Sequence, residues 1–142
     1  MSAIAAHLRR RVAERAGNLC EYCRLPSRGQ VGPFPVDHVT PRTAGGVTEF
    51  ENLALACPAC NGHKWAHTTG IDSISGEVAS LFNPRVQIWI EHFRWDFNDP
   101  DILEGTTPTG RATIDRLQMN DPALVMVRRL LRELGIPVNK TH

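Results

Sequence analysis

At 142 residues, with 42% hydrophobic and 22% charged side chains, the chain can bury one hydrophobic core but not two independent ones. The sequence contains no run of 18 apolar residues, and the consecutive arginines 9–11 interrupt the stretch where a signal peptide needs its apolar segment. We therefore expect a single domain, residues 1–142, in a soluble, cytoplasmic protein that makes no membrane contact.

The net charge of +1 hides a strong segregation of charge along the chain. Residues 1–35 carry six Arg against two Glu, whereas residues 69–110 carry seven acids against two Arg. Residues 111–142 return to five Arg and one Lys against three acids. If the basic ends meet in space they could form a phosphate-binding face, and the alternative is that they are solvated helix surfaces.

The first predicted element is an amphipathic helix over residues 3–16, because apolar residues recur there at helical spacing: Ile4, Ala5, Leu8, Val12 and Ala16. Its four arginines form a basic side, and Gly17 is expected to end it.

All four cysteines occur in two C-x-x-C pairs, Cys20 with Cys23 and Cys57 with Cys60. A pair with this spacing can present both sulfurs to one tetrahedral ion, and two pairs complete a four-thiolate zinc site. Disulfide bonds and a redox-active pair are the alternatives. Four thiolates leave no open coordination position, so this zinc would hold the fold and the chemistry would lie elsewhere.

The segment between the pairs predicts strand, turn, strand and helix. In residues 36–40, bounded by prolines, the β-branched Val36, Val39 and Thr40 surround the Asp-His pair, which indicates a strand. Gly45-Gly46 supplies a turn, and residues 53–57 form the returning strand. Pro58 suits the first turn of the following helix. This arrangement would bring Asp37 and His38 opposite Asn61.

Beyond this segment, residues 89–97 and 102–107 predict two strands joined across a turn, followed by two helices. The first helix covers residues 110–120 with Thr109 as its N-cap, and the second follows Asp121-Pro122 and is closed by Gly135 and Pro137. For Trp89, Phe93 and Trp95, core packing is favoured over a platform for stacking bases.

The ordered motifs D-H-x-x-P, G-G, E-N-L and C-x-x-C-N-x-x-K resemble the HNH endonuclease family. The likeness covers residue 20 to about residue 67, and the motifs W-x-E-H-F and G-R-A-T-I in the tail are similar to segments that follow the nuclease core in some bacterial HNH proteins. It implies an α+β fold with a ββα-metal (His-Me finger) core in residues 18–68 and an extension in residues 69–142. It further implies cleavage of nucleic acid, with double-stranded DNA as the favoured substrate, and the oligomeric state stays open.

The resemblance assigns His38 as the general base, Asn52 as the middle Asn of the motif, and Asp37 and Asn61 as ligands of a catalytic metal. The chemistry of these residues agrees, because a neutral imidazole can accept a proton near pH 7, and carboxylate and amide oxygens favour Mg²⁺ or Mn²⁺. We expect Asn52 to orient the His38 loop by hydrogen bonding and not to bind the ion.

Three further residues are weaker candidates. Lys64 could contact a phosphate from the helix surface, and a solvated lysine is the alternative. His63 and His67 are four residues apart and would share one helix face, where they could contact DNA or a metal or simply be exposed.

The leading hypothesis is a metal-dependent DNA endonuclease with a structural zinc and a catalytic Mg²⁺ or Mn²⁺. The alternative is a non-catalytic, zinc-stabilised nucleic-acid-binding module. A zinc deaminase fits poorly, because that class needs an H-x-E motif, which His38-Val39-Thr40 does not provide.

Overall fold

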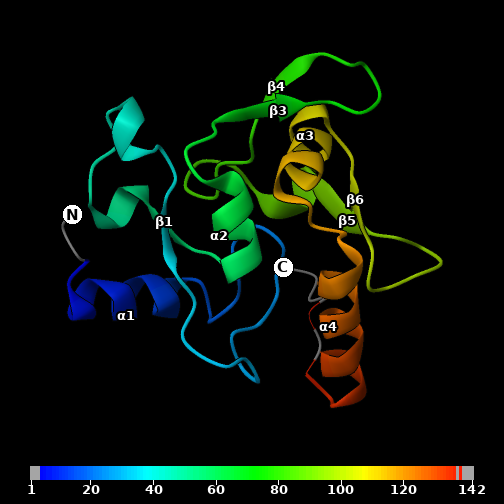
Figure 1. The fold of residues 1–142 in the computed structure, drawn as a ribbon, viewed down its shortest axis with the longest axis horizontal. Helices are drawn as coiled ribbons and strands as arrows, with labels where there is room; N and C mark the ends of the chain where they lie inside the picture. Colours follow the sequence, from blue (N-terminus) through cyan, green and yellow to red (C-terminus); the bar gives the residue numbers. More distant parts are fainter. Residues whose placement is uncertain (1–3, 137, 139–142) are drawn as a thin grey trace.

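The computed structural model describes residues 4–136 and 138, and it has the mixed α+β architecture expected from the sequence (Figure 1). Its α-helices in these residues are α1 (Ala6–Arg15), α2 (Pro58–Lys64), α3 (Pro108–Leu117) and α4 (Pro122–Glu133). None of them is long and apolar enough to cross a membrane.

The strands form three separate antiparallel pairs. β1 (Val36–His38) pairs with β2 (Leu53–Leu55), β3 (Thr69–Ile71) with β4 (Val78–Ser80), and β5 (Phe93–Trp95) with β6 (Leu103–Gly105). The predicted ββα unit and the second hairpin are therefore confirmed, whereas the β3–β4 hairpin was not predicted. Short 3-10 turns lie at Arg42–Ala44, Phe50–Asn52 and Trp89–Glu91.

Helix α2 starts where the sequence predicts, with Pro58 in its first turn and the Cys57 sulfur accepting a hydrogen bond from the Cys60 backbone N–H at 3.4 Å. Helix α4 likewise starts after Asp121, whose carboxylate accepts from the Ala123 N–H at 2.9 Å. In Figure 1, α2 lies between the β1–β2 hairpin and α3.

Two boundary predictions are wrong. The N-cap of α3 is Thr107 and not Thr109, because Pro108 takes the first helical position and the Thr107 hydroxyl accepts from the Gly110 N–H at 3.0 Å. The strand expected over residues 89–97 is limited to Phe93–Trp95, since its first part folds into the 3-10 turn. Pro137 lies outside the described residues.

One core connects the nuclease-like segment to the C-terminal extension. Trp89 and Phe93 are buried and stacked, with ring centroids 5.1 Å apart, so the prediction of core packing is confirmed. The Trp89 indole N–H donates to the Tyr22 carbonyl at 2.7 Å, and Arg85 pairs with Glu21 and donates to the Leu53 carbonyl. The extension therefore braces the first cysteine pair and strand β2.

Candidate functional site

The four cysteines form one buried cluster in which all four sulfur atoms lie within 4.8 Å of one another. Sγ of Cys23 and Sγ of Cys57 are 3.7 Å apart, close to the edge of about 3.8 Å that a tetrahedron with metal–sulfur bonds of about 2.3 Å requires. All four thiols are free, so the disulfide alternative is excluded for this structure. The cluster has the donors and the spacing of a structural zinc site.

Each pair of the cluster sits in a turn that the local backbone stabilises. The N–H of Cys23 points to the sulfur of Cys20 at 3.5 Å, as the N–H of Cys60 does to that of Cys57. Burial raises the pKa of the Cys20 thiol well above its ordinary value. A bound cation is what would favour its thiolate.

A second site lies on the β1–α2 side of the core, where Asp37, His38 and Asn61 line one pocket of about 440 Å³. Asp37 and His38 come from β1 and Asn61 from the middle of α2, so the hairpin-and-helix geometry brings together residues that are 24 positions apart. Arg42 and Trp65 also line this pocket, and Trp65 is 74% exposed. Asn52 is not among its lining residues.

Asp37 is buried and held at one carboxylate oxygen by two donors. Its Oδ2 accepts a hydrogen bond from the Tyr22 hydroxyl at 2.7 Å and lies 3.0 Å from the Lys64 ammonium nitrogen. Burial raises the pKa of Asp37, while Lys64 and Tyr22 act in the opposite direction. Both contacts use Oδ2, so they fix one of the two carboxylate oxygens.

The structure contradicts the prediction that Lys64 contacts phosphate, as well as the solvated alternative. Lys64 is only 1% exposed, and besides Asp37 it donates to the carbonyls of His38 and Val39, each at 3.1 Å. Three acceptors match the three N–H groups of the ammonium, so Lys64 ties α2 to β1 from inside the core.

His38 is partly exposed, and its Nε2 lies 2.8 Å from the Thr48 hydroxyl. Burial lowers the pKa of His38, with the Asp37 carboxylate opposing that shift. A lowered pKa keeps the imidazole neutral at neutral pH, which is the form a proton acceptor needs.

Asn52 joins the two ends of the loop between β1 and β2. Its Oδ1 accepts from the Thr40 N–H at 2.9 Å, and its Nδ2 donates to the carbonyls of Thr40 at 3.0 Å and Val47 at 2.9 Å. The loop leaves room for these bonds only because Gly46 has no side chain: a Cβ there would lie 1.7 Å from the Thr40 carbonyl oxygen. Gly45 supplies the left-handed turn, with φ of 88°.

The prediction that His63 and His67 share one face of a helix is also wrong. Helix α2 ends at Lys64 and Trp65 has a positive φ, so His67 lies beyond the helix, where its ring meets Trp65 edge-on at 5.9 Å between centroids. His63 lines a different pocket, against α4. Across residues 4–136 and 138, the cysteine cluster is the one group of three or more His, Cys, Asp or Glu placed to share a metal ion.

Sequence reasoning missed Tyr22 and Thr48 as partners of the site. Tyr22 lies inside the first C-x-x-C pair, so the sequence indicates that it is close to the cysteine cluster. Its contact with Asp37 could not be predicted, because it is a tertiary contact across 15 residues. Thr48 lies at the far end of the glycine loop, and no local pattern indicates which hydroxyl will face His38.

Comparison with known proteins shows what this segment is similar to. Residues 20–66 match the HNH endonuclease family, which covers both cysteine pairs and the Asp37–Asn61 pocket. The Septu protein PtuB of Bacillus thuringiensis is 27% identical over 120 residues, which cover 83% of this chain and 43% of that protein. The chain therefore spans less than half the length of this relative. No solved structure matches the chain.

Proposed function

We propose that the chain is a metal-dependent endonuclease that hydrolyses phosphodiester bonds of DNA, because residues 20–66 match the HNH endonuclease family. The observation that carries this proposal is the convergence of Asp37, His38 and Asn61 on one pocket. The links from Trp89 and Arg85 to the first cysteine pair and to β2 favour a single domain over residues 1–142.

In this proposal His38 accepts a proton from the attacking water. In the tautomer in which Nε2–H donates to the Thr48 hydroxyl, the lone pair lies on Nδ1, and Nδ1 is then the nitrogen that takes the proton. Asn52 keeps the His38 loop in place through its three hydrogen bonds.

Asp37 Oδ1 and the Asn61 amide oxygen are a hard-oxygen donor pair suited to Mg²⁺ or Mn²⁺, with water and a substrate phosphate as the remaining ligands. Such an ion would neutralise charge that develops on the leaving oxygen. The contribution of the protein is to fix Asp37 through the contacts of its Oδ2 with Tyr22 and Lys64. The cysteine cluster would hold a separate structural zinc and take no part in the reaction.

The test is plasmid nicking in the presence of Mg²⁺ or Mn²⁺. We expect the wild-type protein to cleave and His38→Ala to lose about 10²- to 10⁴-fold in rate, the usual contribution of a general base. His63→Ala is the matched control, since His63 is exposed and lines the pocket against α4. Cleavage by His38→Ala at the wild-type rate would refute the assignment.

One observation favours the alternative, a non-catalytic nucleic-acid-binding module. The Lys64 ammonium already provides a positive charge 3.0 Å from Asp37, which reduces the electrostatic need for a second cation. In that case Mn²⁺ titration would detect no ion whose binding depends on Asp37, and DNA would bind without being cut. Asp37→Asn separates the two functions, because only the enzyme loses metal affinity and cleavage together.

A further inference from the structure

We infer that the groove lined by Arg9 and Arg10 binds backbone phosphates of the nucleic-acid strand whose scissile bond lies in the His38 pocket. This inference rests on the proposed function and adds to it the path that the substrate takes over the surface. It also assigns a role to part of the basic N-terminal segment, for which the sequence left open whether it is a phosphate-binding face or a solvated surface.

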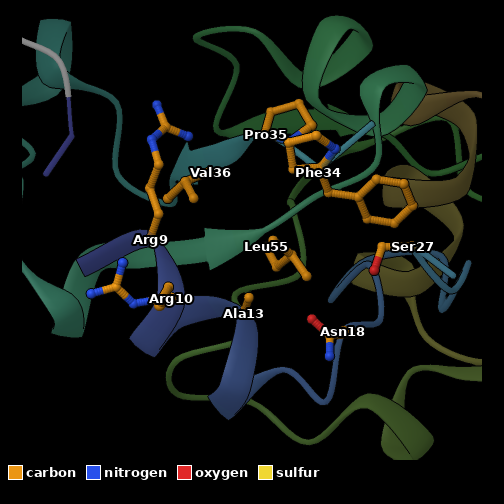
Figure 2. Close-up of a pocket in the computed structure, with 10 residues that line it drawn as sticks. Arg9, Arg10, Ala13, Asn18, Ser27, Phe34, Pro35, Val36 and Leu55 are labelled. Carbon is orange, nitrogen blue, oxygen red and sulfur yellow. The ribbon is translucent and has the colours of Figure 1, made fainter. Parts of the chain in front are cut away.

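The groove is a hollow of about 460 Å³ between α1 and the segment that enters β1. In Figure 2, Arg9, Arg10 and Ala13 come from α1, and Phe34, Pro35 and Val36 lie across from them; Arg9 extends alongside Val36, whereas the guanidinium group of Arg10 points away from Phe34 and Pro35. Val36 lines this groove and also the pocket that holds Asp37, His38 and Asn61. The two hollows therefore share one lining residue of β1, and the proposed strand would pass from one to the other there.

The charges along this path suit a polyanion. The groove has Arg9 and Arg10 in its lining and no acid, while the adjoining pocket has Arg42 and, as its one acid, Asp37. Arg9 and Arg10 thus line the groove next to the His38 pocket, and Arg42 lines the His38 pocket itself. A protein whose net charge is only +1 concentrates cations where phosphates flanking a cut would lie.

The four arginines of α1 form two pairs that differ in their contacts, although all four side chains are exposed. Arg11 and Arg15 stack over Phe50, with guanidinium carbons 4.3 Å and 3.8 Å from the ring centroid, and Arg15 also donates to the carbonyls of Phe50 and Leu53. Arg9 and Arg10 are exposed, and within residues 4–136 and 138 neither forms a salt bridge with a carboxylate. Arg9 donates from Nε to the Ile4 carbonyl at 3.3 Å, which leaves its two terminal nitrogens for a phosphate.

The groove also has an apolar wall, formed by Pro33, Phe34, Pro35, Val36 and Leu55. In grooves that bind single-stranded nucleic acid, cationic side chains follow the backbone and ring side chains contact the bases, so this wall suits the bases of a strand whose phosphates meet Arg9 and Arg10. The geometry points to the phosphodiester backbone as the ligand rather than to a specific base.

The test measures DNA binding as a function of salt concentration, in buffer without added Mg²⁺ or Mn²⁺ so that no cleavage occurs. We expect Arg9→Gln/Arg10→Gln to bind more weakly, with the slope of log K against log salt less steep by about 1.8 for duplex DNA or about 1.4 for a single strand. The matched control is Arg28→Gln/Arg94→Gln, which removes the same charge from exposed arginines that line neither hollow.

Steady-state cleavage supplies a second readout, in which the double variant should show a raised KM and an unchanged kcat. Equal salt slopes for the double variant and its control would overturn the inference while leaving the proposed function intact. If Arg9→Gln/Arg10→Gln shows the expected change in salt slope but the wild-type protein never cleaves DNA, the inference about the groove holds and the proposed endonuclease activity fails. Zinc content, measured on every variant, shows that the fold is retained.

Discussion

Lys64 and Asp37 form an ion pair inside the protein, with 3.0 Å between Nζ and Oδ2 and side chains that are 2% and 5% exposed. An isolated carboxylate at this depth would be costly, and the ammonium together with the Tyr22 hydroxyl compensates it. The same two donors fix the orientation of Asp37. The pair therefore both stabilises the core and positions a proposed metal ligand.

Removal of the Tyr22 hydroxyl tests the positioning role. Tyr22→Phe keeps the buried ring and deletes one of the two donors to Asp37, so we expect affinity for Mn²⁺ or cleavage activity to fall about 10- to 100-fold, as for other partners of metal ligands. Mn²⁺ titration followed by electron paramagnetic resonance measures this loss. Lys64→Met should instead destabilise the fold by about 3–5 kcal/mol, because it leaves a buried charge unpaired.

Thr113→Val is the control for Tyr22→Phe. The Thr113 hydroxyl is also buried and hydrogen-bonded, to the Phe82 N–H and the Thr109 carbonyl, but it lies far along the chain in α3 and does not line the site. Thr113→Val should lower stability without changing Mn²⁺ affinity. An equal loss of affinity in both variants would show that the effect of Tyr22 is merely structural.

Gly46→Ala should disrupt the loop between β1 and β2, which places Thr48 beside His38. The added Cβ would lie 1.7 Å from the Thr40 carbonyl oxygen and 2.9 Å from Asn52 Nδ2, so the loop must shift, at a cost of about 1–3 kcal/mol. We expect a lower unfolding midpoint in urea and slower cleavage. Gly62→Ala is the control: a Cβ there meets nothing within 4 Å, and the helix should gain up to about 1 kcal/mol.

Loss of zinc should unfold the protein. Structural zinc contributes about 10–16 kcal/mol in small zinc domains, comparable to the whole stability of about 5–15 kcal/mol of a typical domain. Cys57→Ser should therefore lose both the metal, measured by elemental analysis, and the near-ultraviolet circular dichroism of the packed aromatics. A folded, metal-free Cys57→Ser protein would contradict the structural role of the cluster.

The Asp72–Arg111 pair predicts how stability depends on pH. Arg111 Nε lies 2.6 Å from Asp72 Oδ1, and this pair holds the pKa of the buried carboxyl well below its ordinary value. Because the folded state favours the ionised form, the contribution is complete above the unfolded pKa of about 4 and is lost as the pH falls through the lower folded pKa. The β3–β4 hairpin should loosen from α3 in acid.

Asp72→Asn isolates this contribution because it removes the charge and keeps the shape. We expect the variant to unfold at lower urea than wild type at pH 7, and the difference to narrow as the pH falls below about 4. Asp115→Asn is the control: Asp115 is exposed and lies on α3, the helix that carries Arg111, so its replacement should leave the urea midpoint unchanged. A wild-type advantage that persists undiminished in strong acid would disprove the linkage.

Elements with strong local signals were predictable from the sequence. Pro58 and Asp121-Pro122 mark helix starts, and the β-branched run around Asp37 marks β1. The β3–β4 hairpin was missed because its sequence, residues 69–80, lacks clear alternation of apolar and polar residues. That hairpin is held by α3 and Arg111, which are long-range contacts.

The same division applies to the site. The C-x-x-C spacing was enough to predict the cysteine cluster, because the ligand geometry is local within each pair. The burial of Lys64 was not predictable, since its partners on β1 lie 25 to 27 positions away and a lysine near a helix end is usually solvated.

The cysteine cluster also determines where the protein is chemically vulnerable. The segment that carries Asp37, His38 and Asn52 begins and ends at the same four sulfurs, so oxidation of those sulfurs would release both of its ends at once. An oxidant that expels a zinc ion bound there would thus abolish the proposed activity, while every residue proposed for the reaction remains chemically intact.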